Sequence, residues 1–235
     1  MVKNNDPQPG GHINHRTRVG EERRGKTRAR LIKGALHVFA KHGADAKVID
    51  LVIREAGVAR GTFYNHFRSN EELFAAVAKE VSNEIIRIVD PLVRQQADPA
   101  ARIACGVSTV VKLAITYPDF AQFVSRGGPL AVSAGSLATK VVPRDVDAGI
   151  ATGRFSVSDK NLAFDIILGP VIMAFHRVLS RRVPKNYPEE LAQAVLQSLG
   201  VSKALAKRYA SQSFGEIEIS EDSLFARPLG RITSK

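Results

Sequence analysis

The chain of 235 residues has one cysteine and no tryptophan. Cys105 alone cannot form an internal disulfide bond, which fits a reducing compartment. The sequence has no run that approaches the roughly 18 to 20 uncharged apolar residues of a membrane-spanning helix. Residues 1–26 are polar throughout and lack the apolar centre of a signal peptide. We therefore expect a soluble, cytoplasmic protein.

Enzyme signatures are also absent from the sequence. It contains no phosphate-binding glycine loop, no HExxH metal-binding pattern and no GxSxG nucleophile turn. The acidic residues are scattered, without the spacing of catalytic pairs or metal ligands. A lone cysteine has no resolving partner within the chain, so we do not expect a redox sensor. We expect no enzymatic activity, no metal and no cofactor, and a helical enzyme that processes a small molecule is the weakest hypothesis.

Positive charge is what the sequence has in excess, with a formal net charge of +11. Residues 1–68 hold 14 Lys and Arg against 6 Asp and Glu, a net +8, whereas residues 69–235 hold 20 against 17, a net +3. This concentration favours a polyanionic partner such as DNA. Residues 1–22 lack apolar periodicity, and we predict that they form a flexible basic arm. The arm either is simply solvated or enters a minor groove of DNA, and the sequence favours neither alternative.

Apolar residues recur at three- and four-residue steps along most of the remaining chain, which is typical of helices with one buried face. Ser69 and Glu72 form a capping box that opens a long helix, and Asp98 with Pro99 opens the next one. The predicted helices cover residues 26–43, 48–57, 58–67, 69–93, 98–117, 118–126, 130–151, 159–182, 188–199 and 202–211. No strand is predicted, so the fold class is all-α.

Two short helices joined at Gly57 form the pattern of a helix-turn-helix. Glycine suits this turn because a positive φ costs it little. The second helix is expected to enter the major groove of DNA, with Phe63 and Phe67 packed in the core behind it. The residues of this helix predicted to face DNA are Arg60 (guanine or phosphate), Gly61 (close backbone approach), Thr62, Tyr64 (phosphate), Asn65 and His66.

The stretch GVARGTFYNHFRSNEELF resembles the corresponding segment of the TetR family of bacterial transcriptional regulators. The resemblance runs from about Thr27 to Val89 and includes the REAGV turn, GTFYNHF and EELF. The sequence departs from the family at Ala59, where serine or threonine commonly caps the recognition helix. It also has Lys47 at the start of the preceding helix, where threonine is usual, and the ammonium group of Lys47 would contact a phosphate instead.

Beyond Val89 the resemblance implies only an architecture, an all-helical domain that binds a ligand and forms dimers. The mostly apolar side chains of this region predict a largely apolar effector, drug-like or lipid-like. Gly169-Pro170 interrupts the most apolar helix, either as a structural kink or as the place where a cavity opens. The candidate ligand-binding residues, each more often an ordinary core residue, are Phe120, Phe123, Leu130, Phe164, Met173 and His176. The expected dimer interface combines helix 159–182 with an apolar seam made by Leu191, Val195, Leu196 and Leu199.

The sequence thus predicts an N-terminal three-helix helix-turn-helix DNA-binding domain followed by a larger helical ligand-binding and dimerisation domain. The predicted segments are the basic arm (1–22), the DNA-binding domain (23–68, family-like to about 89), the ligand-binding and dimerisation domain (69–212) and a poorly ordered C-terminal tail (213–235). The leading hypothesis is a homodimeric repressor that its effector releases from a palindromic operator in double-stranded DNA. The rival is an architectural DNA-binding protein without a ligand response. The large apolar region after Val89 argues against this rival, because coating DNA needs no such domain.

Overall fold

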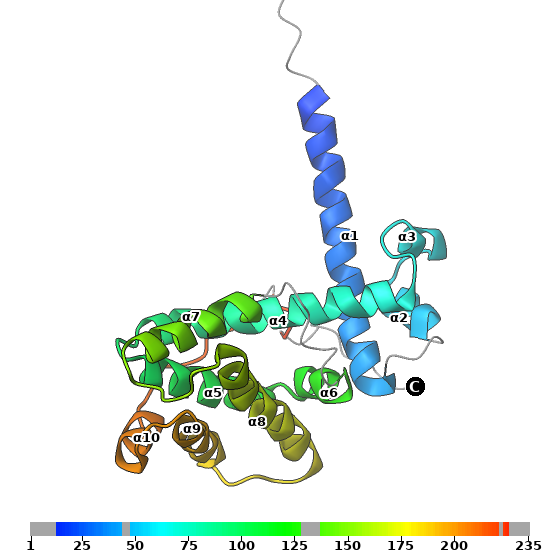
Figure 1. The fold of residues 1–235 in the computed structure, drawn as a ribbon. Coiled ribbons are helices and arrows are strands. Elements are labelled where there is room, and N and C mark those ends of the chain that lie inside the picture. Colours follow the sequence, from blue (N-terminus) through cyan, green and yellow to red (C-terminus); the bar gives the residue numbers. More distant parts are fainter. Residues whose placement is uncertain (1–12, 44–47, 128–136, 221–222, 226–235) are drawn as a thin grey trace, which may run out of the picture.

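The computed structural model of the chain describes residues 13–43, 48–127, 137–220 and 223–225 (Figure 1). All regular secondary structure within these ranges is helical, which confirms the all-α class. The N-terminal helices are α1 (Ile13–His42), α2 (Val48–Ala56), α3 (Arg60–Tyr64) and α4 (Asn70–Arg94). The C-terminal helices are α5 (Pro99–Thr116), α6 (Pro118–Gly127), α7 (Ala138–Ala151), α8 (Lys160–Ser180), α9 (Tyr187–Ser198) and α10 (Lys203–Ala210).

Helix α4 connects the two ends of the molecule, with α2 and α3 at its start and α5 and α7 beside its second half (Figure 1). The Ser69 half of the predicted capping box is formed, whereas the Glu72 carboxylate bonds one residue earlier than the N-cap. Ser69 Oγ accepts a hydrogen bond from the Glu72 N–H at 3.2 Å, and Glu72 Oε2 accepts one from the Arg68 N–H at 2.8 Å. The 25 residues of α4 correspond to a rod of about 37 Å. One rigid element therefore reaches from the helix-turn-helix into the C-terminal part.

Asp98 fixes the start of α5 and ties neighbouring elements to it. Its carboxylate accepts a hydrogen bond from the Ala100 N–H at 2.8 Å, as the sequence predicts for an N-cap. The same group accepts from Arg154 Nη2 and from Tyr209 Oη, each at 2.6 Å. Burial opposes ionisation, but these hydrogen bonds outweigh it, so the pKa of Asp98 lies below its ordinary value. The cap thus also holds α10 and the end of α7 against α5.

The buried apolar side chains of both halves of the molecule form one continuous cluster. Phe39 of α1, Phe74 of α4 and Phe123 of α6 meet where the halves join, with ring centroids 5.1–6.3 Å apart. His37 Nδ1 lies 2.8 Å from Asp119 Oδ2 and adds a polar contact between α1 and α6. The helix-turn-helix therefore does not sit on a separate core, and it is coupled to the C-terminal part through packing as well as through α4.

Helices α5 and α8 are long and apolar enough to cross a membrane, judged by length and composition alone, with mean hydropathies of 1.2 and 1.7. Both helices contain charged residues, because α5 carries Arg102 and Lys112 and α8 carries Asp165 and Arg177. In α5, 61% of the apolar window is buried inside the protein, as in an ordinary core helix. Only 28% of the α8 window is buried, so α8 presents apolar surface that another molecule can cover.

Helix α1 begins much earlier than the sequence predicts. The expected flexible arm covers residues 1–22, yet the helix already starts at Ile13. The prediction failed because this stretch has no apolar stripe to reveal a helix. Arginine and glutamate nevertheless have high helix propensity, and the Glu22–Lys26 ion pair at 2.7 Å supports the helix across one turn. Part of the predicted arm is therefore a rigid extension of α1.

The C-terminal tail packs against the body where the structure describes it, so the predicted lack of order in residues 213–235 is wrong for that part. The Phe225 side chain is 6% exposed, and its ring centroid lies 5.2 Å from that of Phe120. Lys33 Nζ on α1 donates a hydrogen bond to the carbonyl oxygen of Ser223 at 3.4 Å. The apolar residues of the tail follow no helical period, which is why its sequence gave no sign of packing. It runs from α10 back to α1.

We predict that Phe225→Ala lowers the free energy of unfolding by about 3 kcal/mol, because a buried aromatic ring is replaced by a cavity. Leu224→Ala, which changes a half-buried neighbour, should lower it by only about 1 kcal/mol. Urea denaturation followed by circular dichroism measures both values. Equally small losses for the two variants would show that the tail does not pack on the body in solution.

Candidate nucleic-acid interface and ligand cavity

Gly57 makes the turn between α2 and α3, as predicted. Its φ of +61° lies in the left-handed region, where residues with a side chain are strained. The Gly57 N–H donates to the carbonyl oxygen of Arg54 at 3.2 Å. Arg30 Nη2 of α1 donates to the carbonyl oxygens of Ala56 at 2.8 Å and Gly57 at 3.0 Å. The end of α2 is thereby fixed to α1, and this sets the direction in which α3 leaves.

Phe63 and Phe67 anchor α3 and the following turn, with side chains 0% and 1% exposed. Their predicted place in the core is confirmed. Tyr64 is 46% exposed, and its ring stands edge-on to that of Phe63 at 5.3 Å between centroids. The other predicted DNA contacts in this segment are exposed or half-buried: Thr62, Asn65 and His66. Lys47 lies outside the residues that the structure describes.

Arg60, in the first turn of α3, has a partner in the free protein. Its Nη1 lies 2.8 Å from Asp50 Oδ1, and the two side chains are 65% and 72% exposed. An exposed ion pair contributes about 0.2 to 1 kcal/mol, so Arg60 can exchange Asp50 for a phosphate or a guanine at little cost. Ala59, the N-cap, makes no side-chain capping bond, as its deviation from the family pattern leads us to expect.

Gly61 is not required by the fold. A Cβ atom added at this position would meet no heavy atom of the protein within 4 Å, and the Gly61 backbone is not left-handed. Neither close packing nor backbone conformation therefore explains the glycine. The open space around it lies on the surface predicted to face DNA, where a missing side chain lets another molecule approach the backbone.

A cavity of about 140 Å³ lies between α4, α5, α7 and α8. Its walls are mostly aliphatic and include Ile85, Val89, Val107, Val142, Val171 and Phe175. An apolar protein cavity of about 150 Å³ holds one benzene molecule. The space therefore fits one substituted ring or another molecule of that size. The α8 residues of the wall flank Gly169-Pro170, although α8 continues through this interruption.

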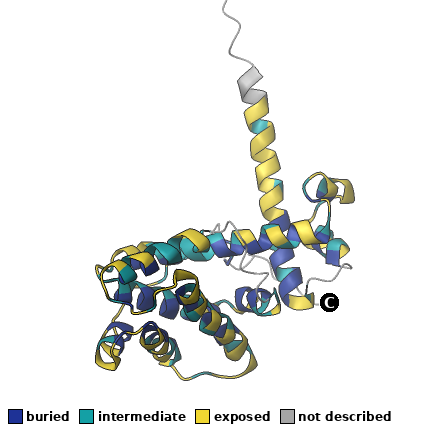
Figure 2. Ribbon diagram, viewed as in Figure 1, coloured by how far each residue is buried: buried dark blue, intermediate teal, exposed yellow. Residues whose placement is uncertain are grey.

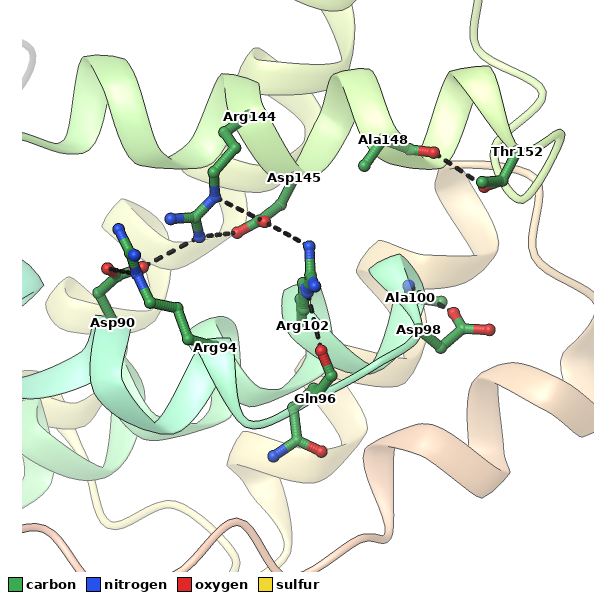
Figure 3. A network of polar contacts seen from close by, with 10 residues as sticks. All are labelled: Asp90, Arg94, Gln96, Asp98, Ala100, Arg102, Arg144, Asp145, Ala148 and Thr152. Atoms are coloured by element: carbon green, nitrogen blue, oxygen red, sulfur yellow. Dashed lines mark hydrogen bonds and ion pairs between the residues drawn. The ribbon is translucent and has the colours of Figure 1, made fainter.

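Charged side chains meet at one end of the cavity (Figure 3). Asp145 of α7 is 2% exposed and accepts hydrogen bonds from Arg144 Nε at 3.0 Å and Nη2 at 2.7 Å. Arg144 Nη2 also donates to Asp90 Oδ1 of α4 at 3.0 Å. Arg102 Nη1 of α5 lies 3.4 Å from Asp145 Oδ1. Asp90, Arg102 and Asp145 line the cavity, so the network joins three of its walls.

Two pKa shifts describe the state of this charged network. Burial opposes the ionisation of Asp90, but hydrogen bonds from Arg144 and Arg94 outweigh it, so the pKa of Asp90 lies below its ordinary value. The hydrogen bond to Asp145 is the main cause that raises the pKa of Arg144. At neutral pH the Asp90 carboxylate is therefore ionised and accepts hydrogen bonds without donating any. A ligand that reaches this end of the cavity matches it best with a hydrogen-bond donor.

The aromatic residues predicted as ligand contacts do not line this cavity. Phe123 belongs to the aromatic contact between α1, α4 and α6. Phe120 packs edge-on against Phe175 at 5.0 Å between ring centroids, and Phe175 is the ring that reaches the cavity. Phe164 is half-buried on α8 and is not a lining residue. Composition alone could not tell cavity walls from ordinary core.

The two predicted ligand contacts near the end of α8 face outward. Met173 is 59% exposed. His176 is exposed as well, and its Nδ1 lies 3.3 Å from Ser125 Oγ. The cavity side of α8 is instead formed by Ile167, Leu168, Val171, Ile172 and Phe175. Leu130, the remaining candidate, lies outside the described residues.

Cys105 lies in the core on α5 and is 0% exposed. Burial raises the pKa of its thiol to about 11, although a hydrogen bond with Thr109 acts in the opposite direction. The thiolate is the reactive form of cysteine. A thiol with this pKa stays protonated at neutral pH, so its environment gives no support to a redox role.

Two family models match the chain. The model described as "Bacterial regulatory proteins, tetR family" matches residues 31–77, and the model described as "Tetracyclin repressor-like, C-terminal domain" matches residues 98–212. RolR, in its crystal structure without ligand, is 30% identical in sequence to this chain. The two structures have a TM-score of 0.65, and the match covers 81% of this chain and 100% of the RolR chain. The chain belongs to the TetR family. The sequence resemblance is confirmed, and with it the division into a helix-turn-helix and a C-terminal helical domain.

Other solved structures share the TetR fold. RolR in complex with its ligand resorcinol is 29% identical, with a TM-score of 0.67 and coverage of 84% of this chain and 100% of that chain. The regulator FadR from Bacillus subtilis in complex with stearoyl-CoA is 20% identical, with a TM-score of 0.60 and coverage of 72% and 96%. At this lower identity the FadR likeness is evidence for the fold alone.

Curated relatives of the chain are also transcriptional regulators, matched over shorter segments. The fatty acid metabolism regulator protein of Bacillus subtilis is 26% identical over 78 residues, which cover 33% of this chain and 40% of the relative. The HTH-type transcriptional regulator SrpR of Pseudomonas putida is 42% identical over 52 residues, which cover 22% of this chain and 24% of SrpR. The matches thus span less than half of each relative, and they support a regulator without naming what it regulates.

No motif in the sequence predicted the charged network at the cavity. Asp90, Arg102 and Asp145 lie on three different helices, and no sequence spacing connects them. One local signal was available. Arg144 and Asp145 interrupt an apolar helix immediately before Val146, which is 0% exposed. A charged pair beside a position that the helical period buries indicates a polar site inside the protein.

We predict that Gly61→Ala weakens DNA binding without destabilising the fold. Alanine should raise the free energy of unfolding by up to about 1 kcal/mol, because glycine is the poorer helix former. The added methyl group should lower the affinity for operator DNA at least tenfold, a loss of about 1.4 kcal/mol. Thermal denaturation and fluorescence anisotropy, with an operator selected from a pool of random duplexes, measure the two effects. Unchanged operator affinity would contradict the assignment of this surface.

Proposed function

We propose that the protein is a transcriptional repressor that leaves its operator when a small effector enters the cavity between α4, α5, α7 and α8. The observation that carries this proposal is the course of α4. This helix begins beside the helix-turn-helix and supplies Ile85, Val89 and Asp90 to the cavity. An effector that displaces one end of a rigid helix also moves the other end. Release of DNA then requires the effector to bind the DNA-free arrangement more tightly than the DNA-bound one.

In this proposal α3 enters the major groove of DNA. A short helix with polar side chains outward and two buried phenylalanines behind it suits that role. Contacts with phosphates fix the position of the protein, and contacts with base edges give the sequence preference. Arg60 and Asn65 are suited to guanine and adenine respectively. The proposed DNA-contacting residues are Lys47, Arg60, Gly61, Thr62, Tyr64, Asn65 and His66.

A homodimer on a palindromic operator completes the proposed DNA complex, because two recognition helices must lie about 34 to 36 Å apart. Leu162 and Met173 of α8 are 54% and 59% exposed, and a second copy of the chain would cover them. The seam expected on α9 contributes less. Val195 and Leu196 are 1% and 0% exposed within a single chain, so they are already covered. We therefore assign most of the interface to α8.

We propose that the effector is one largely apolar ring that carries at least one hydroxyl group. A cavity of about 140 Å³ has the volume of a single ring and is too small for a long lipid chain. Hydroxyl groups of the effector would donate hydrogen bonds to Asp90 and Asp145. RolR, whose crystal structure contains resorcinol, supports this chemistry, because resorcinol is a benzene ring with hydroxyl groups.

The rival functions explain less of the molecule. An architectural DNA-binding protein would account for the basic N-terminal part but not for an apolar cavity with a charged end. An enzyme would need a free acid, base or nucleophile in that cavity, whereas Asp90 and Asp145 are both engaged by Arg144. We propose that the protein acts in the cytoplasm, without enzymatic activity and without a cofactor.

The function is tested with resorcinol, phenol, toluene and stearate. Thermal shift assays detect binding to the protein, and fluorescence anisotropy measures operator affinity in the presence of each compound. We expect the hydroxylated rings to raise the melting temperature and to lower operator affinity, with toluene weaker because it has no donor for the carboxylates. A hydroxylated ring that stabilises the protein strongly but leaves operator affinity unchanged would contradict release by the effector.

Gly106→Ala is predicted to narrow the cavity without harming the fold. Gly106 lines the cavity on α5, and an added Cβ would lie 3.8 Å from Val93 Cγ2, an ordinary contact. Alanine within the helix should stabilise the protein by about 0.5 to 1 kcal/mol. Affinity for the bound ring should nevertheless fall about tenfold, or about 1.4 kcal/mol, because the methyl group takes up space.

Gly20→Ala is the matched control for this variant. It lies on the exposed part of α1, where a Cβ meets nothing within 4 Å, so it improves helix propensity without touching the cavity. Isothermal titration calorimetry measures the affinity of both variants for the most stabilising compound. If both variants bind that compound as the unchanged protein does, the cavity is not the effector site.

A further inference from the structure

The N-terminal part of α1 projects from the body as an isolated helix. Between residues 17 and 30 every side chain is exposed except Val19 and Thr27, which are half-buried, and Figure 2 shows this stretch almost entirely in the colour of exposed residues. Figure 1 shows the helix continuing past the level of α3. A helix without a buried face gains no stability from tertiary packing. The hydrophobic core therefore does not explain this extension.

The basic side chains of the extension fall into two groups. Lys26, Arg28 and Arg30 have partners inside the protein. Lys26 pairs with Glu22, Arg28 lies 5.2 Å from the centroid of the Phe67 ring, and Arg30 bonds to the carbonyl oxygens at the end of α2. Arg18, Arg23 and Arg24 are exposed and form no ion pair with any residue that the structure describes. The guanidinium groups of these three residues remain available to an external anion.

Arg23 and Arg24 face α3 across an open groove of about 500 Å³. The groove is lined from the two sides by Arg23, Arg24 and Thr27 on α1 and by Thr62, Asn65 and His66 on and after α3. Every lining side chain can donate a hydrogen bond, and none is a carboxylate. The groove is electropositive. Burial is the main cause that lowers the pKa of His66, and the charges of Arg24 and Arg28 lower it further.

We propose that this groove binds the phosphate backbone of the DNA strand beside α3, so that this strand lies between α1 and α3. We call this contact the backbone grip. The inference rests on the proposed entry of α3 into the major groove. Guanidinium groups, a hydroxyl, an amide and an imidazole are the donors that proteins use for phosphate oxygens. The shape and charge of the groove therefore suit an anionic strand and carry no preference for particular bases.

The proposed contact differs from that of a flexible arm in a minor groove. A helix that is already formed loses little conformational entropy when it binds, and its side chains stay at a fixed distance from α3. Minor-groove insertion reads groove width and favours A·T-rich sequence. A backbone grip strengthens binding to every sequence to the same extent and increases its dependence on salt.

The test compares the full-length protein with its Arg23→Ala/Arg24→Ala variant, on a selected operator and on a random duplex. Alanine keeps the helix, because it is the best helix former, and circular dichroism verifies this. The proposed dimer would lose four phosphate contacts, two from each chain, so the slope of log Kobs against log salt should become shallower by about 3.6, roughly 0.9 for each lost contact. Affinity for both duplexes should fall by the same factor, about tenfold or more at low salt. Phosphate ethylation should interfere with the full-length protein at positions flanking each half-site and no longer interfere with the variant.

Lys203→Ala/Lys207→Ala is the matched control, because it also removes two exposed positive charges, from α10 at the far end of the molecule (Figure 1). It should leave the salt slope within about half a unit of the original. The grip is overturned if the Arg23/Arg24 variant behaves like this control, or if its loss is confined to A·T-rich flanks. Failure of the unchanged protein to prefer the operator over the random duplex would instead overturn the proposed function, and the grip with it.

Discussion

The burial of one face of α4 along its length is the constraint on which the rest of the molecule depends. Leu73 and Val77 near its start and Val89 and Val93 near its end are all at most 5% exposed. Each such side chain contributes about 1.5 to 3 kcal/mol relative to an exposed one, so α4 cannot detach or bend freely at either end. A change of position at the cavity is therefore carried along the helix instead of being absorbed by local disorder.

A second set of contacts runs from the cavity to the DNA-binding part outside α4. Phe175 lines the cavity and packs against Phe120, and Phe120 packs against Phe225 of the tail. Near Phe225, the carbonyl oxygen of Ser223 accepts a hydrogen bond from Lys33 of α1. Contacts of this kind transmit a signal only if they have two arrangements that both ligands bias. In the proposed repressor, the tail and α4 would therefore move together when the effector binds.

Local signals in the sequence predicted much of the fold, and long-range contacts account for the rest. Ser69 and Asp98 mark helix starts through hydrogen bonds to residues two or three positions away. Gly57 marks a turn through its own φ. Each of these features depends on neighbouring residues only, so the sequence alone predicted it. The cavity network was missed because Asp90 and Asp145 are brought together only by the packing of α4 on α7. The helical extension from Ile13 was not predicted because it packs against nothing. It has no buried face and therefore no apolar period in its sequence.

The distance between the two recognition helices of the proposed dimer tests the central claim most directly, because α4 is proposed to change that distance when the effector binds. A spin label at Glu55→Cys, an exposed position on α2 close to α3, reports this distance by pulsed electron paramagnetic resonance. Cys105 stays unlabelled because it is buried and its pKa is raised to about 11. With operator bound we expect one narrow distribution, set by the half-site spacing of about 34 to 36 Å. An effector that releases DNA should shift this distribution by several ångströms, whereas an unchanged distribution with that effector bound would contradict the account.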